Sequence, residues 1–250
     1  MDPVEFKKLI TTQLSAKGSD KNLRAAALES HRHFGRHGHF HHFEWMGVPV
    51  IQAPQDLIQM QELIFKIKPT LIVETGVARG GSMVFYASIL QLLVDTKQIP
   101  ETSKVVGIDI DIRKYTQEIL DDHPLRSRIE LISGSSTSSD TVAKVRGLAT
   151  KSERVLLCLD SNHTHEHVLL ELELLSSIVT VGSYCVVFDT LVEFMPEIDY
   201  EDRPWGPGNN PHTAVVEFLK NNSDAFRIDT KIDNKLIVSA AINGFLQRIK

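Results

Sequence analysis

Glu74-Thr-Gly-Val-Ala-Arg-Gly-Gly-Ser82 follows a short apolar run and precedes an apolar stretch with helical spacing. Its glycines permit a tight turn from strand to helix and let a ligand approach the N–H groups at the start of that helix. Ala78 stands where a dinucleotide-binding G-x-G-x-x-G motif requires its second glycine, so the turn does not predict NAD binding. Glu74 would repel a pyrophosphate, but it suits a ligand that carries a positive centre beside a carboxylate.

Short β-branched runs alternate with helical segments around this turn, which is typical of βαβ units. The expected strands are 70–75, 104–110, 128–132, 154–160 and 184–189, and the expected helices begin at Pro54 and near 82–94, 113–121, 137–148, 166–178 and 213–221. Beyond them, 226–232, 235–242 and 245–249 are predicted as strands, with Asn243-Gly244 as a hairpin signal. We therefore predict an α/β fold of the Rossmann-like type, with a mostly parallel central sheet, helices on both faces and an antiparallel C-terminal edge.

The composition fits one ordinary domain, because 42% of the 250 residues are hydrophobic and 24% are charged. A net charge of −5 offers no positive excess for a phosphate backbone, so nucleic acid is not an expected partner. Cys158 and Cys185 lie in apolar runs, which favours buried free thiols and a cytoplasmic location. Neither a signal peptide nor a membrane span is expected, since no apolar stretch is long enough.

Residues 1–42 are expected to form an arm in front of a domain at 43–250. The first 30 residues have a polar, helical pattern with a break at Gly18-Ser19, and six of the eleven histidines lie in His31–His42. We interpret that stretch, which contains Phe34 and Phe40, as a segment that docks on the body or on a neighbouring subunit. A homo-oligomer is expected.

Polar residues follow each expected strand, and in an open parallel sheet the ligand binds outside those carboxyl ends. They are Glu74, Asp109, the Gly134–Thr137 turn, Asp160–His163 and Asp189-Thr190. Asp109 is placed to accept hydrogen bonds from ribose hydroxyls. Either Glu74 or Asp109 alone could merely cap a helix, but together with the glycine turn they favour a nucleoside ligand.

Four motifs at these strand ends resemble the cephalosporin hydroxylase family. They are Glu74–Ser82, Gly107–Arg113, Leu159–His167 and Gly182–Thr190. That family has the fold of class I S-adenosylmethionine-dependent methyltransferases and is similar to rhamnosyl and other sugar O-methyltransferases. The resemblance implies an S-adenosylmethionine-dependent O-methyltransferase, assisted by Mg²⁺, of a small hydroxylated molecule such as a sugar, a sugar nucleotide or a natural product.

The resemblance also implies particular cofactor contacts. They are Glu74, Gly76, Ala78 and Ser82 for the methionine part, Asp109 for the ribose, Ser135 and Ser136 for the adenine side, and Asp160.

A Mg²⁺ site is implied at Asp160 and at the 188–190 strand end. Relatives usually have two consecutive acidic or amide groups at that end, whereas this chain has Phe188 before Asp189 and Thr190 after it. Asp160 and Asp189 would suffice with one more oxygen, from Asn162, Thr190 or Glu193, because Mg²⁺ accepts water ligands. Alternatively, the metal site is lost and the carboxylates bind substrate hydroxyls. We favour the metal, because two neighbouring carboxylates repel each other.

The candidates for the general base are His163 and His165, which follow Asp160 and titrate near neutral pH. His167 is expected to be solvated, and a zinc site in this stretch is the weaker alternative. Trp205, in the loop 203–211, is expected either to belong to a lid or to pack on the sheet edge.

Two other functions stay open. A hydroxylase would need two histidines and a carboxylate, for which His42, Glu44 and His212 are candidates, but such sites normally lie on a jelly-roll fold that this pattern does not predict. Phe188 leaves room for a protein that binds the cofactor without turnover.

Overall fold

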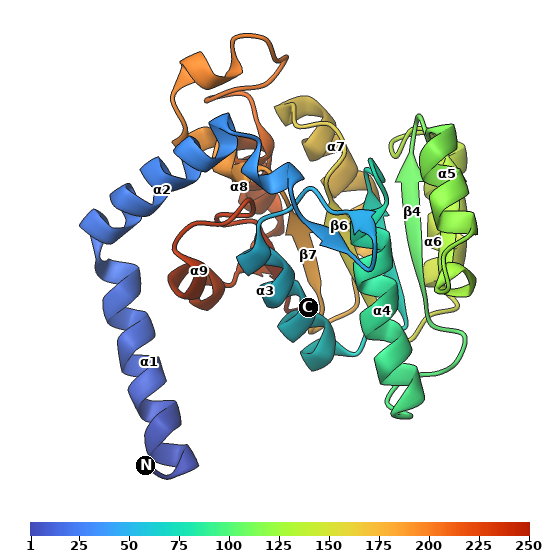
Figure 1. The fold of residues 1–250 in the computed structure, drawn as a ribbon, viewed down its shortest axis with the longest axis horizontal. Helices are drawn as coiled ribbons and strands as arrows, with labels where there is room; N and C mark the ends of the chain where they lie inside the picture. The colour runs from blue at the N-terminus through green and yellow to red at the C-terminus, as the bar shows by residue number, and fades with distance from the viewer.

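The computed structural model describes residues 1–250, and a seven-stranded sheet forms its centre (Figure 1). In sheet order the strands are β5 (Ile129–Ser133), β4 (Lys104–Asp109), β3 (Leu71–Thr75), β6 (Val155–Leu159), β7 (Tyr184–Val187), β9 (Phe245–Arg248) and β8 (Phe226–Ile228). The first five are parallel, whereas β9 runs antiparallel to both of its neighbours. The predicted α/β fold with an antiparallel C-terminal edge is confirmed. The strand order reverses between β3 and β6, which is where such sheets bind ligands.

Helices cover both faces of the sheet. The helices that pack on one face are α3 (Pro54–Ile67), α4 (Gly81–Asp95), α5 (Lys114–Asp121) and α9 (Thr230–Leu236); those on the other are α6 (Ser139–Ala149), α7 (His165–Leu175) and α8 (Pro211–Asn222). Ile72 of β3 belongs to the first apolar core, while its neighbours Leu71 and Val73 belong to the second. This alternation explains the continuous apolar runs of β3, β6 and β7, because both faces of these central strands are buried.

Two helices precede the sheet: α1 (Pro3–Ser19) and α2 (Lys21–Arg36). Figure 1 shows α1 projecting from the body, and none of its residues is buried. The chain bends at Asp20, close to the predicted break, and Asp20 caps α2 by accepting a hydrogen bond from the N–H of Leu23 at 2.9 Å. None of the helices combines the length and apolarity needed to cross a membrane.

Short elements complete the chain. They are the hairpin strands β1 (Glu44–Trp45) and β2 (Val48–Pro49), and the 3-10 turns η1 (His39–His41), η2 (Arg126–Arg128), η3 (Ser176–Ile178), η4 (Thr190–Phe194) and η5 (Glu197–Tyr200).

The prediction of a strand at 235–242 is wrong, and the strand predicted at 226–232 ends at Ile228. Residues 230–236 form α9, and the rest of that segment is a turn. Strand β9 already pairs with β7 and β8, so the sheet has no free edge next to it for another strand. The backbone of Ala240 is satisfied by side chains instead, because its N–H donates to Asp56 at 2.9 Å and its carbonyl accepts from Thr190 at 3.4 Å. Asn243-Gly244 therefore turns from this segment into β9 and does not join two paired strands.

Gly76 is expected to be essential for stability. Its φ is 88°, and an added Cβ would lie 2.0 Å from the carbonyl oxygen of Asp160. Backbone strain and overpacking together predict that Gly76→Ala lowers the free energy of unfolding by about 2–4 kcal/mol in urea titrations. Gly147→Ala is the matched control. It lies in α6, where an added Cβ meets nothing within 4 Å, so it is expected to raise stability by about 0.5–1 kcal/mol. Equal effects of the two substitutions would contradict this explanation.

Candidate active site

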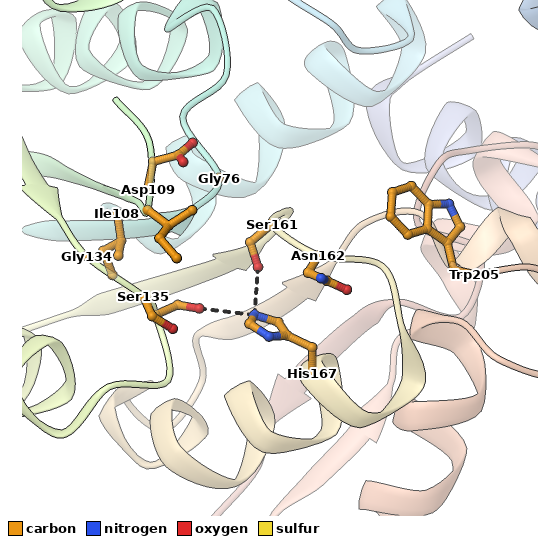
Figure 2. A pocket seen from close by; sticks show the side chains of 11 residues that line it. Gly76, Ile108, Asp109, Gly134, Ser135, Ser161, Asn162, His167 and Trp205 are labelled. Carbon is orange, nitrogen blue, oxygen red and sulfur yellow. Dashed lines mark hydrogen bonds between the residues drawn. The ribbon is translucent and has the colours of Figure 1, made fainter. Parts of the chain in front are cut away.

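A cavity of about 440 Å³ opens at the carboxyl ends of β3, β4, β5 and β6. Its lining comes from the loops after these strands (Figure 2): Gly76, Ile108, Asp109, Ile110, Gly134, Ser135, Ser136, Ser161, Asn162, His167 and Trp205. Four of the predicted cofactor contacts, Gly76, Asp109, Ser135 and Ser136, therefore lie together. The volume is that of an ordinary small-molecule site.

Asp109 both lines this cavity and holds the glycine turn. Its Oδ2 accepts hydrogen bonds from the N–H groups of Val77 (2.8 Å) and Ala78 (3.3 Å), and its Oδ1 accepts one from Asp111 (3.0 Å). Ala78 has a φ of 46°, a conformation that residues other than glycine rarely adopt. The bonds from Asp109 stabilise this strained turn, so the acid shapes the cavity through the backbone.

Glu74 lies behind the turn and is completely buried. Ser82 donates a hydrogen bond to its Oε2 at 2.6 Å, while Oε1 has no hydrogen-bond partner. Burial raises the pKa of Glu74 to about 8, because ionisation would leave an uncompensated charge in the protein interior. A cationic group on a ligand would favour the ionised form.

His167 lines the cavity, which corrects the expectation that it is solvated. Its Nε2 lies 3.2 Å from the hydroxyl of Ser136. The same nitrogen lies 3.3 Å from the hydroxyl of Ser161 (Figure 2). The sequence holds one local signal for this position, because Glu171 follows His167 by four residues and such a pair lies on one face of a helix. In the structure Glu171 is completely buried, and its Oε1 lies 3.4 Å from His167 Nε2.

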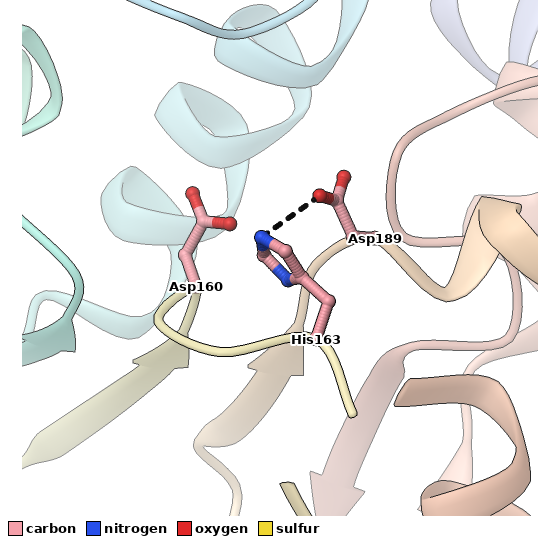
Figure 3. Close-up of side chains that lie close together, drawn as sticks. All are labelled: Asp160, His163 and Asp189. Atoms are coloured by element: carbon pink, nitrogen blue, oxygen red, sulfur yellow. Dashed lines mark ion pairs between the residues drawn. The ribbon is translucent and has the colours of Figure 1, made fainter. Parts of the chain in front are cut away.

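Asp160, His163 and Asp189 gather at the ends of β6 and β7 (Figure 3). One ligand atom of each lies within 4.8 Å of the other two, and His163 Nε2 lies 3.2 Å from Asp189 Oδ2. Asp189 has a φ of 55°, a second strained position at the site. Burial, together with the charges of Asp189 and Glu74, raises the pKa of Asp160 well above its ordinary value. The three side chains, called here the acid–histidine cluster, would therefore be stabilised by a cation.

The third member of this cluster is His163, not one of the three predicted oxygen donors. The hydroxyl of Thr190 donates to a backbone carbonyl, and the amide oxygen of Asn162 accepts hydrogen bonds at the start of the next helix. Glu193 accepts two hydrogen bonds from residues 208 and 210. Phe188 is 1% exposed and belongs to the apolar core, so its side chain points away from the cluster.

The structure separates the two predicted base candidates. His165 begins α7 and faces α8, where its Nδ1 lies 2.8 Å from Thr213 Oγ1 and its Nε2 lies 3.3 Å from Glu217 Oε2. It therefore joins two helices and is not in the acid–histidine cluster. Trp205 packs edge-on against His163, with ring centroids 4.9 Å apart, and it also lines the cavity. The tryptophan thus lies over the cluster and not against the edge of the sheet.

Comparison with known families matches residues 37–249 to the Rhamnosyl O-methyltransferase/CmcI family. The chain belongs to this family. The resemblance carried by the four strand-end motifs is therefore confirmed.

The chain is similar in sequence to rhamnosyl O-methyltransferases and similar in fold to several solved structures. Rhamnosyl O-methyltransferases of Mycobacterium tuberculosis H37Rv and Mycobacterium leprae are 28% and 27% identical over 206 and 205 residues, which is 82% of this chain and 77% and 82% of those proteins. A CmcI structure with Mg and SAM has a TM-score of 0.61 at 19% identity and covers 84% of this chain and 78% of its own. The O-methyltransferase from Bacillus cereus in complex with SAH has a TM-score of 0.50 at 12% identity, over 90% and 91% of the two chains.

The geometry of this CmcI-family member does not support the hydroxylase alternative. The acid–histidine cluster has one histidine and two carboxylates, whereas the iron site of such hydroxylases needs the reverse. His42, Glu44 and His212 form no such group, and the chain has a parallel sheet in place of a jelly roll.

The buried Glu74 predicts a pH-dependent stability difference. An acid whose pKa is about 8 in the folded protein and 4.5 unfolded costs stability progressively as the pH rises from about 4.5 to 8. Glu74→Gln has no charge to bury, so its unfolding free energy relative to wild type is expected to rise by a few kcal/mol between pH 5 and pH 8.5. Urea titrations at several pH values measure this, with the exposed Glu173→Gln on α7 as control. A difference that stays constant with pH would contradict the burial of the charge.

Proposed function

We propose that the protein transfers a methyl group from S-adenosylmethionine to a hydroxyl of a sugar or natural product, with Mg²⁺ at the acid–histidine cluster. The observation that carries this proposal is the position of the cluster. Its members follow β6 and β7, and Ser161 and Asn162, next to Asp160, already line the cavity at the glycine turn. The family of rhamnosyl O-methyltransferases supports the same activity.

Polar residues of the cavity wall, and Glu74 buried behind the turn, would hold S-adenosylmethionine. Gly76 leaves the backbone open at the turn, and Asp109 offers a carboxylate for ribose hydroxyls. The unpartnered Oε1 of Glu74 suits the positive side of a methionine group. We assign Ser135, Ser136 and His167 to the adenine side, while Ala78 and Ser82 act through the turn and through Glu74.

The acid–histidine cluster fits Mg²⁺ through its donors. Two carboxylates approach each other without a lysine or arginine in the group, and Mg²⁺ binds to one or two carboxylates while it keeps several water ligands. Asp160 and Asp189 would hold the ion. Bound Mg²⁺ would lower the pKa of an acceptor hydroxyl, and bound S-adenosylmethionine would supply the methyl group.

His163 is placed to take the proton from the acceptor. Its Nε2 faces Asp189, its side chain is 15% exposed, and Trp205 covers its ring from one side. A carboxylate next to an imidazole orients the ring and stabilises the charge that develops when the ring gains a proton. The protein therefore contributes a positioned base and a site partly shielded from water, while the displacement itself depends on alignment of donor and acceptor.

The acceptor class follows from relatives. The Mycobacterium proteins are rhamnosyl O-methyltransferases, and MycE, with a TM-score of 0.50 at 14% identity, has a structure with Mg, SAH and mycinamycin VI. A hydroxylated sugar or natural product is the corresponding acceptor for this chain. A homo-oligomer and a boundary between arm and domain at residues 42 and 43 remain predictions.

Cofactor binding tests the first half of the proposal. Isothermal titration calorimetry with S-adenosylmethionine is expected to show one site per chain in the wild type. Asp109→Ala removes both the ribose acceptor and the bonds that hold the turn, so its affinity is expected to fall on the order of 100-fold. Asp111→Ala, an exposed acid two residues away, is the control and should bind as the wild type does. A wild type without affinity would refute the proposal.

Metal binding tests the second half. Millimolar MgCl₂ is expected to raise the Tm of the wild type, because an ion that binds only the folded state stabilises it. Asp160→Asn removes a buried carboxylate that the charge of Asp189 repels, so without Mg²⁺ this variant should have a higher Tm than the wild type. Addition of MgCl₂ should not raise the Tm of the variant further. Asp140→Asn, exposed at the start of α6, should respond to MgCl₂ as the wild type does. A Tm that does not change with MgCl₂ in the wild type would exclude the metal from the proposal.

A further inference from the structure

A second cavity, of about 330 Å³, is lined by Asp189 and shares no lining residue with the cavity at the glycine turn, called here the cofactor cavity. One wall comes from the arm, with His31, Gly35 and Phe40, and the other comes from the η4–η5 segment, with Leu191 and Tyr200. Residues 31–36 precede the segment that the family model matches, so most of this wall lies outside the shared family core.

Ion pairs and apolar contacts hold the arm in this position. Asp199 accepts hydrogen bonds from Arg32 Nε at 2.6 Å and from Arg36 Nη2 at 3.1 Å. Leu28 of α2 packs against a small buried group of Leu191, Met195 and Ile242. The wall is therefore built from specific contacts on both sides of the cavity.

The acid–histidine cluster lies between the two cavities. Residues adjacent to Asp160 line the cofactor cavity, Asp189 lines the second cavity, and His163 contacts Asp189. Methyl transfer by direct displacement places the methyl carbon between the leaving sulfur and the acceptor oxygen, with the proton acceptor beside that oxygen. A cluster that borders both cavities would let an acceptor in the second cavity meet a cofactor in the first, with His163 beside the acceptor oxygen.

We propose that the second cavity is the acceptor subsite, that it binds a hydroxylated ring the size of a sugar, and that residues 31–40 of the arm form the wall that selects this ring. This inference rests on the proposed function.

The chemistry of the walls favours such a ring. His31 stacks on Phe40, with ring centroids 4.4 Å apart and planes 26° apart, and flat rings of this kind pack against the apolar face of a sugar. On the same wall, Arg36 keeps guanidinium N–H groups that Asp199 does not use, and these can donate to ring hydroxyls. Burial lowers the pKa of His31 to about 4 and raises the pKa of Tyr200 to about 12, so both contribute neutral polar groups at physiological pH.

A single accessible thiol in this wall allows a direct test. Both native cysteines are buried, so Gly35→Cys supplies the only exposed thiol, and an added Cβ at Gly35 makes an ordinary contact of 3.9 Å with Phe40. The variant is treated with benzyl methanethiosulfonate, which fills the cavity after the protein has folded. Ala25→Cys, exposed on the same helix and outside the cavity lining, is the matched control.

Binding is measured before and after modification, with p-nitrophenyl α-L-rhamnopyranoside as the probe and with S-adenosylhomocysteine and MgCl₂ present. Modified Gly35→Cys is expected to bind the rhamnoside at least tenfold more weakly while its affinity for S-adenosylhomocysteine stays within twofold. Modified Ala25→Cys should change in neither. No rhamnoside binding by the unmodified proteins, or equal binding after modification, would overturn the inference. If the wild type does not bind S-adenosylhomocysteine at all, the proposed function itself is refuted.

Discussion

Repulsion between carboxylates at one edge of the sheet is the constraint on which this site depends. Asp160 and Asp189 end the neighbouring strands β6 and β7, and Glu74 lies buried one strand further on. In a parallel sheet such side chains cannot move apart, because backbone hydrogen bonds fix the strand ends. Burial raises the pKa of Glu74, and burial together with the charges of Asp189 and Glu74 raises the pKa of Asp160. Under the proposed function a metal ion would stabilise the ionised form of Asp160, and the cationic part of the cofactor would stabilise that of Glu74. Without a ligand, ionisation of Asp160 and Glu74 is unfavourable because both carboxylates are buried. This edge of the sheet therefore favours ligands that carry positive charge.

The sequence predicts the parallel part of the fold and its strand-end residues because both depend on local patterns. The central β-branched runs are buried on two faces, and the polar residues after the parallel strands lie at the same sheet edge. The C-terminal segment 235–242 shows the limit of this reasoning. Its apolar spacing suits a strand, yet β9 takes the position between β7 and β8, and the segment packs through Ala240 and Ile242 instead. Competition for a sheet edge is a tertiary property that periodicity does not contain.

The histidines after Asp160 show the same limit for the site. A stretch with histidines at 163, 165 and 167 does not reveal which of them face one cavity, since this depends on where the helix begins. With α7 starting at His165, positions 165 and 167 point in nearly opposite directions, because successive residues differ by about 100° around a helix. His165 then meets Thr213, 48 residues later, and His167 meets Ser136, 31 residues earlier. Of the three histidines, it is His163, in the loop before the helix, that contacts Asp189.

The arm and a metal ion would act on the same acidic edge from two sides. Asp189 and Asp199 border the second cavity ten residues apart, and hydrogen bonds from Arg32 and Arg36 hold the pKa of Asp199 below its ordinary value. With the arm docked, the two guanidiniums more than offset the charge of Asp199, so Asp189 is the acid of this cavity that has no arginine partner, and there the cluster would hold a cation. If α2 moved away, both carboxylates would face the same space, and a cation at the cluster would no longer be drawn to one position. The docked arm therefore has two effects. It forms one wall of the second cavity, and it leaves Asp189, at the cluster where acceptor and cofactor would meet, as the acid without an arginine partner.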